Sequence, residues 1–401
     1  MRSEIELSLI GSMSSPIDSL LADFEQKQRI PIRLRYTDWR NGWQEVVGYS
    51  LHGNEPHISH IGMTWVSSLM RMNALRPFQP REIAALGGEN AYLAPCWQSL
   101  TDADGVAWGL PWTSYTFLLA YRRDLLQNAG IDETTAFSSA QALENTLAAL
   151  KDSGVNTPWS IPTCQAHTDT LHFVASWLWG AGGKIASTDG KAPLFADAPA
   201  LSGMKSFFDL HRYMVPDATS RTADELRSLF WDGQAAVTLC GVDEPYIRQT
   251  GPYGPPEIFD RIGFAPVPGV PWVGGDGLVI WRSTQVSPSI EQAAVALVSY
   301  LVSPQAQRAY CQMIKNHHKP TRLDVLPDLP QQGSNLTNAV KQALTTGRSY
   351  RPIPLWGRIE SQLSSTLNTV WEEIFAGKTP EDALHNALDP LAHRLGITLA
   401  S

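Results

Sequence analysis

The chain has 401 residues, well above the size of one small domain, so we expect two large lobes or three small domains. It carries 31 lysines and arginines against 39 aspartates and glutamates, a net charge of −8, which excludes the strongly basic surface typical of nucleic-acid binding. With 43% hydrophobic and 17% charged residues, the composition predicts a compact fold rather than a disordered chain. The longest nearly apolar run, residues 293–302, is about half of the ~20 residues that cross a bilayer, so we expect no membrane span.

The first forty residues predict a strand, a helix and a second strand. Apolar and polar residues alternate over residues 5–10, and the run ends at a glycine. A helix is expected next, with Ser15 as its N-cap, Pro16 at its first position and apolar residues on one face of 17–24. Alternation resumes over residues 32–36. This strand, helix, strand order is typical of a parallel sheet in an α/β fold.

Open α/β sheets bind ligands beyond the carboxyl ends of their strands. Here those positions are residues 11–14, residues 37–43 and the segment after a short apolar stretch at 58–61. We interpret 37–43 as a loop that carries Trp39, Arg40 and Trp43, and the third strand end delivers Trp65. Three strand ends should therefore meet at one edge. The 14 tryptophans of the chain suit cores, interfaces or ligand-stacking walls.

The rest of the chain predicts a second, more helical lobe and a return to the first. Helices are expected near 140–150, 171–179, 201–213, 290–302 and from 358 onward, and strands near 235–239 and 273–280. Two prolines stiffen residues 263–269, which suits a segment that crosses between lobes.

Several motifs point to no cofactor or metal. Residues 180–184 (GAGGK) lack the spacing of a phosphate-binding loop and predict a helix C-cap turn instead. His57 with His60, and His317 with His318, are interpreted as core or surface side chains. The four cysteines, Cys96, Cys164, Cys240 and Cys311, are too far apart for a zinc site; buried thiols or disulfides are both compatible with their spacing.

Carboxylates near tryptophans leave two functions open. Asp243 and Glu244 follow the strand at 235–239, and Asp276 lies within a glycine-rich segment. Such groups can act as the acid and base of a glycosidase, or they can accept hydrogen bonds from sugar hydroxyls.

Several stretches, in chain order, resemble the family 1 extracellular solute-binding proteins, the sugar receptors of ATP-binding-cassette importers. The most specific is GVAWGLPWTSYTFLLAYRRDLLQNAGID at 105–132, in which Arg122 replaces the usual asparagine. FWDGQAAVTLCG at 230–241, the segments 266–280 and 293–307, and the tail from RPIPLWGRIE to FAGKTPEDAL are also similar to the family pattern.

The resemblance implies a two-lobe α/β fold of the periplasmic-binding-protein type, with a ligand cleft between lobes that close by hinge motion. The lobes would comprise residues 1–113 with 268–320, and residues 114–267 with 321–401. Crossover segments would lie near 111–117, 264–269 and 317–325. The resemblance further implies a monomer without enzymatic activity that works at the outer face of the cytoplasmic membrane and passes its sugar to permease subunits. Its targeting segment would be absent from this chain.

The resemblance and the sugar chemistry together assign roles to twelve residues. Candidate aromatic walls are Trp39, Trp65, Trp112, Trp272 and Trp356, of which two or three are expected to touch the ligand. Candidate acceptors are Asp243, Glu244 and Asp276, candidate donors are Arg40 and Arg348, and Ser12 and Gly275 would approach the ligand closely. Two alternatives remain: a receptor for an anionic sugar conjugate, suggested by the arginines, and a glycosidase or lyase.

Overall fold

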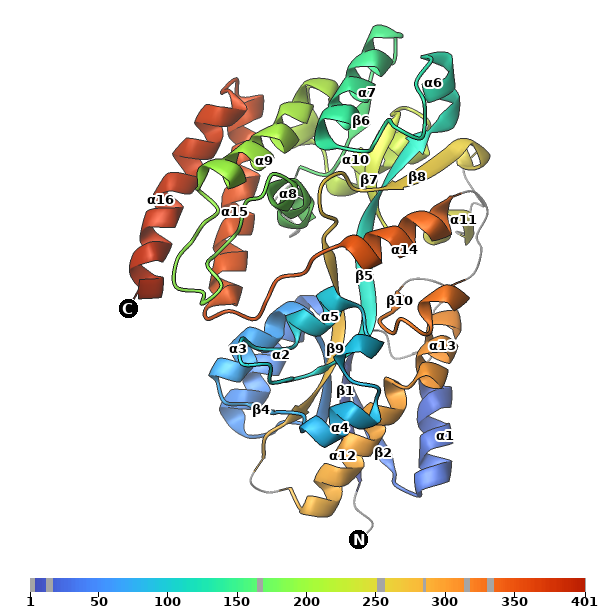
Figure 1. Ribbon diagram of the computed structural model, residues 1–401, viewed down its shortest axis with the longest axis vertical. Helices are drawn as coiled ribbons and strands as arrows, with labels where there is room; N and C mark the ends of the chain where they lie inside the picture. Colours follow the sequence, from blue (N-terminus) through green and yellow to red (C-terminus); the bar gives the residue numbers. More distant parts are fainter. Residues whose placement is uncertain are drawn as a thin grey trace. The chain divides into compact units, whose positions relative to one another are not determined.

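The computed structural model describes residues 4–11, 17–163, 169–250, 257–283, 286–313, 318–329 and 335–400. The chain forms two compact units (Figure 1). Unit 1 comprises residues 1–115, 273–329 and 349–357, and unit 2 comprises residues 116–272, 330–348 and 358–401. The chain therefore first changes unit between residues 115 and 116, and again between 272 and 273, whereas the sequence placed these boundaries at 113/114 and 267/268.

Unit 1 is built around a mixed sheet. Its strands are β1 (Ile5–Ile10), β2 (Ile32–Thr37), β3 (Ile58–Gly62), β4 (Leu75–Arg76), the start of β5 (Leu110–Arg122), β9 (Val273–Trp281) and β10 (Lys319–Pro320). Its helices are α1 (Asp18–Gln28), α2 (Trp39–His52), α3 (Val66–Arg71), α4 (Pro80–Ala85), α5 (Ala94–Ser99), α12 (Pro288–Leu301) and α13 (Pro304–Met313), with short 3₁₀ turns η1 (Met63–Trp65), η2 (Glu89–Ala91) and η6 (Leu326–Asp328).

The predicted parallel arrangement of the first strands is confirmed. β1 pairs in parallel with β2 and with β3, and β9 runs antiparallel to β3, so that Gly62 lies opposite Asp276. β1 is buried along its whole length, and its apolar side chains share one core with α1 and α12. Tyr300 on α12 donates a 2.6 Å hydrogen bond to Asp23 on α1 and locks the two helices together.

One predicted loop is wrong. Residues 37–43 were expected to form a loop, but α2 already begins at Trp39. The cause is local: Asp38 has extended backbone geometry, and its carboxylate accepts a 2.8 Å hydrogen bond from the amide of Asn41, which is N-cap chemistry. The predicted cap Ser15 and Pro16 of the preceding helix lie outside the described residues.

Unit 2 contains a smaller sheet under a larger helical cover. In this sheet β5 lies between β7 (Val237–Gly241) and β8 (Ile262–Pro266), both antiparallel to it, and β6 (Trp159–Ser160) runs parallel to β7. The helices are α6 (Arg123–Asn128), α7 (Ala140–Asp152), α8 (Asp169–Gly180), α9 (Ala198–Phe208), α10 (Ala223–Trp231), α11 (Glu244–Thr250), α14 (Leu336–Thr346), α15 (Trp356–Phe375) and α16 (Pro380–Ala400), with 3₁₀ turns η3 (Asp209–Tyr213), η4 (Ala218–Ser220) and η5 (Phe259–Arg261).

Aromatic side chains and close glycine contacts hold the helices of unit 2 together. Phe208 on α9 packs edge-on against Trp371 on α15, with ring centroids 4.5 Å apart. The predicted C-cap turn after α8 is confirmed, because the amide of Gly183 donates to the carbonyl of Leu178 at 2.9 Å. A Cβ on Gly183 would lie 2.6 Å from the backbone of α9, so glycine is required there for helix packing and not for phosphate binding.

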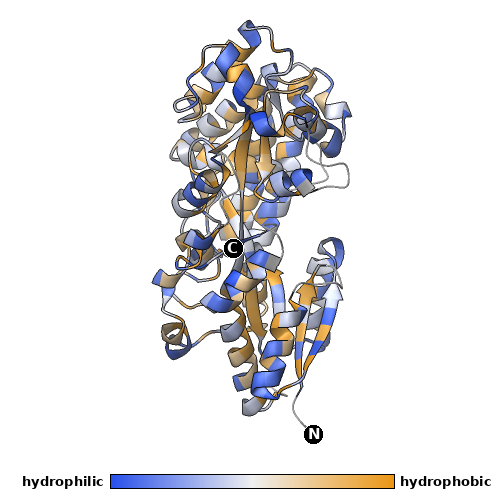
Figure 2. Cartoon of the chain, turned by 90° about the vertical axis from the view of Figure 1, so that its right-hand side faces the viewer, coloured by the Kyte–Doolittle hydropathy of each residue, from blue (hydrophilic) through white to orange (hydrophobic). Residues whose placement is uncertain are grey.

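The hydropathy of the strands agrees with this division into core and surface. Figure 2 shows mainly hydrophobic residues along the inner strands, and every residue of β5 except Tyr115 is buried. Among the described residues, no helix is long and apolar enough to span a membrane.

Candidate functional site

Three tryptophans gather at the carboxyl ends of the parallel strands in unit 1. Trp39 and Trp43 lie one turn apart on α2, and each contacts Trp65 from η1, with ring centroids 5.6 and 5.5 Å apart. We call Trp39, Trp43 and Trp65 the tryptophan cluster. Trp39 is 48% exposed, unusual for so large an apolar side chain, so it offers aromatic surface to solvent. The predicted meeting is thereby confirmed for the strand ends at residues 37–43 and 58–61, whereas most of residues 11–14 lies outside the described residues.

Gly62, at the end of β3, lies directly beside the cluster. A Cβ at this position would be 3.6 Å from both Trp39 and Trp65. Trp39 also packs edge-on against His60, two residues earlier on β3, with ring centroids 5.8 Å apart. The cluster is therefore continuous with the end of β3.

A buried carboxylate lies beside the tryptophan cluster. Asp276 on β9 is 5% exposed. Its Oδ2 accepts a 2.8 Å hydrogen bond from the Thr113 hydroxyl, and it lies 3.3 Å from Nε2 of His60 and 3.6 Å from Nδ1 of His318. None of these contacts involves Oδ1, and no other hydrogen bond or ion pair from the described residues reaches that atom.

The backbone fixes the proton on His60. The amide of Ile10, at the end of β1, donates to Nδ1 of His60 at 3.2 Å. A neutral His60 ring therefore carries its proton on Nε2, the nitrogen that faces Asp276. His57 makes the same kind of bond, because its Nδ1 accepts the amide of Glu6 at 2.8 Å. Both histidines thus satisfy amides of β1.

The surroundings of Asp276 favour its charged form. Burial by itself raises the pKa of a carboxyl group, but His60, His318 and the Thr113 hydroxyl together hold the pKa of Asp276 below its usual value. Asp276 is thus a buried carboxylate whose Oδ2 is held by Thr113 and lies near two histidines.

Trp112 supports this arrangement from inside the core. It is 1% exposed, stacks on Tyr310 with ring centroids 4.6 Å apart, and meets His60 edge-on at 5.0 Å. Trp112 therefore contacts His60 from a buried position in β5.

Gly275 has a structural reason to be glycine. Its φ is +136°, and a Cβ would lie only 2.1 Å from the carbonyl oxygen of Thr113. Glycine is therefore needed where β9 passes close to β5, one residue before Asp276.

The predicted site residues of unit 2 are buried in that unit or contact other side chains of the same unit. Trp272 is 8% exposed and stacks flat on His172, with ring centroids 4.0 Å apart. Arg348 places its guanidinium over Trp179, 5.2 Å from the ring centroid. Glu244 accepts a 2.7 Å hydrogen bond from the indole of Trp231.

The remaining predicted site residues lie in different parts of the structure. Burial raises the pKa of Glu244, an effect that Arg248 and Arg227 oppose only in part. Its neighbour Asp243 is half-buried at the start of α11. Trp356, in unit 1, is 3% exposed and stacks on Tyr350. Arg40 is exposed on α2, and Ser12 lies outside the described residues.

The sequence did not single out three members of the site. Thr113 and His318 carry no local signal, because they reach Asp276 from segments about 200 residues apart in the chain. His60 does have one: it lies two residues before Gly62 on a strand, hence on the same face of the sheet as the glycine under the tryptophans. No group of three or more potential metal ligands occurs among the described residues.

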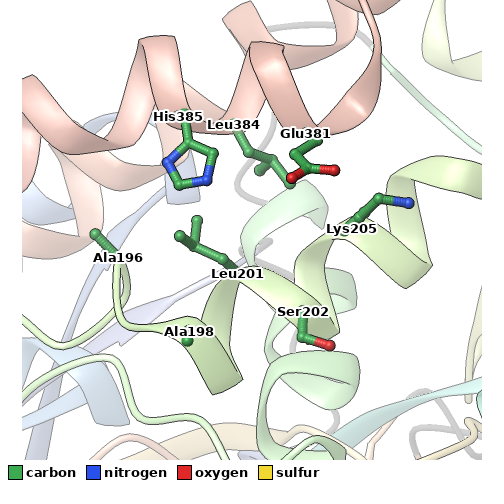
Figure 3. Close-up of a pocket in the computed structure, with 8 residues that line it drawn as sticks. All are labelled: Ala196, Ala198, Leu201, Ser202, Lys205, Glu381, Leu384 and His385. Carbon is green, nitrogen blue, oxygen red and sulfur yellow. The ribbon is translucent and has the colours of Figure 1, made fainter.

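A separate cavity lies within unit 2, between α9 and α16 (Figure 3). It has a volume of about 440 Å³ and is lined by Ala196, Ala198, Leu201, Ser202, Lys205, Glu381, Leu384 and His385. Lys205 is paired with Asp209 at 2.8 Å, and Nδ1 of His385 lies 3.2 Å from Asp389, so charged groups of this rim already have partners on their own helices. None of the predicted site residues lines this cavity.

Residues 11–308 match the family model of the bacterial extracellular solute-binding proteins, and the chain belongs to this family. It is therefore a solute-binding receptor and not an enzyme, which removes the glycosidase alternative. A comparison with curated protein sequences found no match.

Solved structures share the fold over the full chain. The sugar-binding protein MalE from Xanthomonas citri has a TM-score of 0.82 at 21% identity, covering 99% of this chain and 98% of that one. A solute-binding protein from Thermotoga lettingae, bound with α-D-tagatose, has a TM-score of 0.74 at 22% identity, covering 99% and 100%. The cyclic α-maltosyl-1,6-maltose binding protein from Arthrobacter globiformis has 0.77 at 14%, covering all of both chains. The predicted periplasmic-binding-protein fold is thus confirmed.

Proposed function

We propose that the protein is a carbohydrate receptor that binds its sugar at the tryptophan cluster and Asp276 and delivers it to the permease of an ATP-binding-cassette importer. The observation that carries the proposal is the exposed ring of Trp39 beside a buried carboxylate. The tagatose complex and the cyclic-maltosyl-maltose binding protein, which share the fold, support a sugar as the cargo.

The chemistry of the two groups is complementary to a pyranose. A sugar ring has an apolar face that packs on an indole and a rim of hydroxyl groups that need acceptors. Oδ1 of Asp276 supplies a charged acceptor, and hydrogen bonds to charged groups are stronger than neutral ones. Oδ2 is held by Thr113, so the carboxylate is oriented before the ligand arrives.

Three further points belong to the same proposal. The receptor would act as a monomer at the outer face of the cytoplasmic membrane, and its partners would be permease subunits. Closure of the two lobes around the sugar would accompany binding, and a smaller radius of gyration on saturation, measured by solution scattering, would test this step. The remaining candidate contributors are Trp112, Trp272, Trp356, Gly275, Asp243 and Glu244.

A thermal-shift screen with mono- and oligosaccharides, glycosides and polyols tests the proposal, because a ligand that binds the folded state raises its melting temperature. We expect at least one saccharide to do so, and Trp39→Ala to weaken its binding by about tenfold or more. Leu51→Ala is the matched control: Leu51 lies on the same helix and is 70% exposed. A panel without any hit, or equal binding by Trp39→Ala and wild type, would contradict the proposal.

A further inference from the structure

The sign of the charge at the candidate site limits the sugars that fit it. Asp276 is the acidic group of the site; the Thr113 hydroxyl donates to its Oδ2, and Nε2 of His60 lies 3.3 Å from the same oxygen. The amide of Ile10 donates to Nδ1 of His60 at 3.2 Å, so the backbone holds the ring with Nε2 toward the carboxylate.

Arg40, the predicted cation next to the tryptophan cluster in the chain, lies on a different face of α2 from Trp39 and Trp43. Arg40 follows Trp39 directly on α2, and adjacent residues of a helix point about 100° apart, whereas Trp39 and Trp43, four apart, lie on one face. Both tryptophans contact Trp65. The helix thus turns Arg40 away from the surface that the cluster presents.

The other predicted arginine belongs to a different place. Arg348 lies in unit 2, where its guanidinium covers Trp179. Among the described residues of unit 1, His318 is the other basic side chain paired with Asp276; its side chain is 34% exposed, and its Nδ1 lies 3.6 Å from Oδ2, the oxygen already bonded to Thr113. The oxygen left for a ligand is Oδ1.

We propose that Asp276 makes the site charge-selective: it takes sugars that are uncharged or carry an amine, and it excludes uronic acids and phosphorylated sugars. This inference rests on the proposed function, whose site it narrows to a class of cargo. A ligand amine gains a counter-ion beside aromatic rings that also attract cations. A ligand carboxylate meets a like charge in a largely desolvated position, which is worth at least a tenfold loss of affinity.

A two-by-two cycle isolates the charge effect. Glucuronamide and glucuronate have nearly the same shape and differ in charge. The substitution Asp276→Asn likewise removes the charge of the side chain and keeps its shape. We expect the wild type, in calorimetric titrations, to prefer glucuronamide at least tenfold and Asp276→Asn to reduce the preference below about threefold, because the cycle removes every term except the coupling of the two charges. Equal binding of the two probes by the wild type, or an unchanged preference in the variant, would overturn the inference.

A second measurement separates failure of this inference from failure of the sugar-receptor proposal. If no saccharide binds, the sugar-receptor proposal falls, but charge at the site is still measurable through quenching of Trp39 fluorescence, taken as the difference between wild type and Trp39→Phe. With each quenching constant divided by that of the same ion on free N-acetyltryptophanamide, we expect the caesium ratio to exceed the iodide ratio, and the gap to narrow in Asp276→Asn. A normalised iodide ratio equal to or above that of caesium in the wild type, or an unchanged gap in Asp276→Asn, would overturn the inference independently of any sugar.

Discussion

At the scale of single residues, the backbone around Asp276 is as specialised as its side chain. Gly275 adopts a φ of +136° in contact with the carbonyl of Thr113, the residue whose hydroxyl holds Asp276. The same close approach of β5 and β9 therefore sets the position of donor and acceptor. A side chain at 275 would push these two strands apart.

Gly275→Ala tests this contact. A Cβ placed 2.1 Å from a backbone oxygen cannot be relieved by a side-chain rotation, so we expect a loss of at least about 2 kcal/mol in the free energy of unfolding. Gly48→Ala, in the middle of α2 with only His52 at 3.9 Å, should instead be neutral or stabilise by up to about 1 kcal/mol. Urea unfolding measures the free energy of unfolding of both variants. Similar changes in Gly275→Ala and Gly48→Ala would contradict the role assigned to Gly275.

His172 predicts how stability depends on pH. Burial lowers the pKa of His172 to about 3, against 6.5 when it is unperturbed. Between these values the unfolded chain binds a proton that the folded chain does not, so stability falls as the pH drops below about 6.5. His172→Phe keeps the ring on Trp272 and should flatten this fall between pH 7 and 4.5, measured by urea unfolding. His52→Gln, at an exposed position of α2, is the control; a slope unchanged in His172→Phe would rule out this source.

At the scale of elements, α2 positions the tryptophan cluster through its first turn. Its N-cap Asp38 directly precedes Trp39, and its carboxylate bonds the amide of Asn41. A helix start that frays would free Trp39 from its contact with Trp65, because the exposed first turn has few other restraints.

Asp38→Ala should therefore cost about 1 kcal/mol of stability and weaken sugar binding severalfold, whereas Asp38→Ser, which keeps an N-cap oxygen, should stay close to wild type. Chemical unfolding and calorimetric titration of both variants provide the two readouts. If alanine and serine behaved alike, the cap would have no role in positioning Trp39.

The elements also show which parts of the site were predictable. The alternation of β1 and β2 and the helix between them predict parallel strands, and parallel strands end at one edge, so Trp39 and Trp65 could be expected to meet. The pairing of β3 with β9 is different. It joins residues more than 200 positions apart, and no local pattern indicates that Gly62 lies opposite Asp276.

The local sequence also could not predict which of the candidate tryptophans are buried. Trp112, Trp272 and Trp356 were candidates on the same ground as Trp39, a position in a loop or just beyond a strand or crossing, yet they are 1%, 8% and 3% exposed. Whether a tryptophan faces solvent depends on which distant segments cover it, as Tyr310 covers Trp112 and Tyr350 covers Trp356. Residue type and spacing therefore predicted candidates, and tertiary packing separated them.

At the scale of the whole molecule, β5 is the strand that runs from unit 1 into unit 2. β5 begins in unit 1 with Trp112 and Thr113 and continues into the centre of the sheet of unit 2. Thr113, which holds Oδ2 of Asp276, thus lies at the start of a strand shared by both units. This placement agrees with the role of a solute-binding receptor, in which ligand binding shifts the population of conformations of the chain.

The most direct test of the sugar-receptor proposal is a crystal structure of the protein with the saccharide that raises its melting temperature most. We predict that the sugar ring packs on Trp39 or Trp65 and that one of its hydroxyl or amino groups donates to Oδ1 of Asp276. A saccharide bound only elsewhere, for example in the cavity between α9 and α16, with the tryptophan cluster uncontacted, would contradict the proposal.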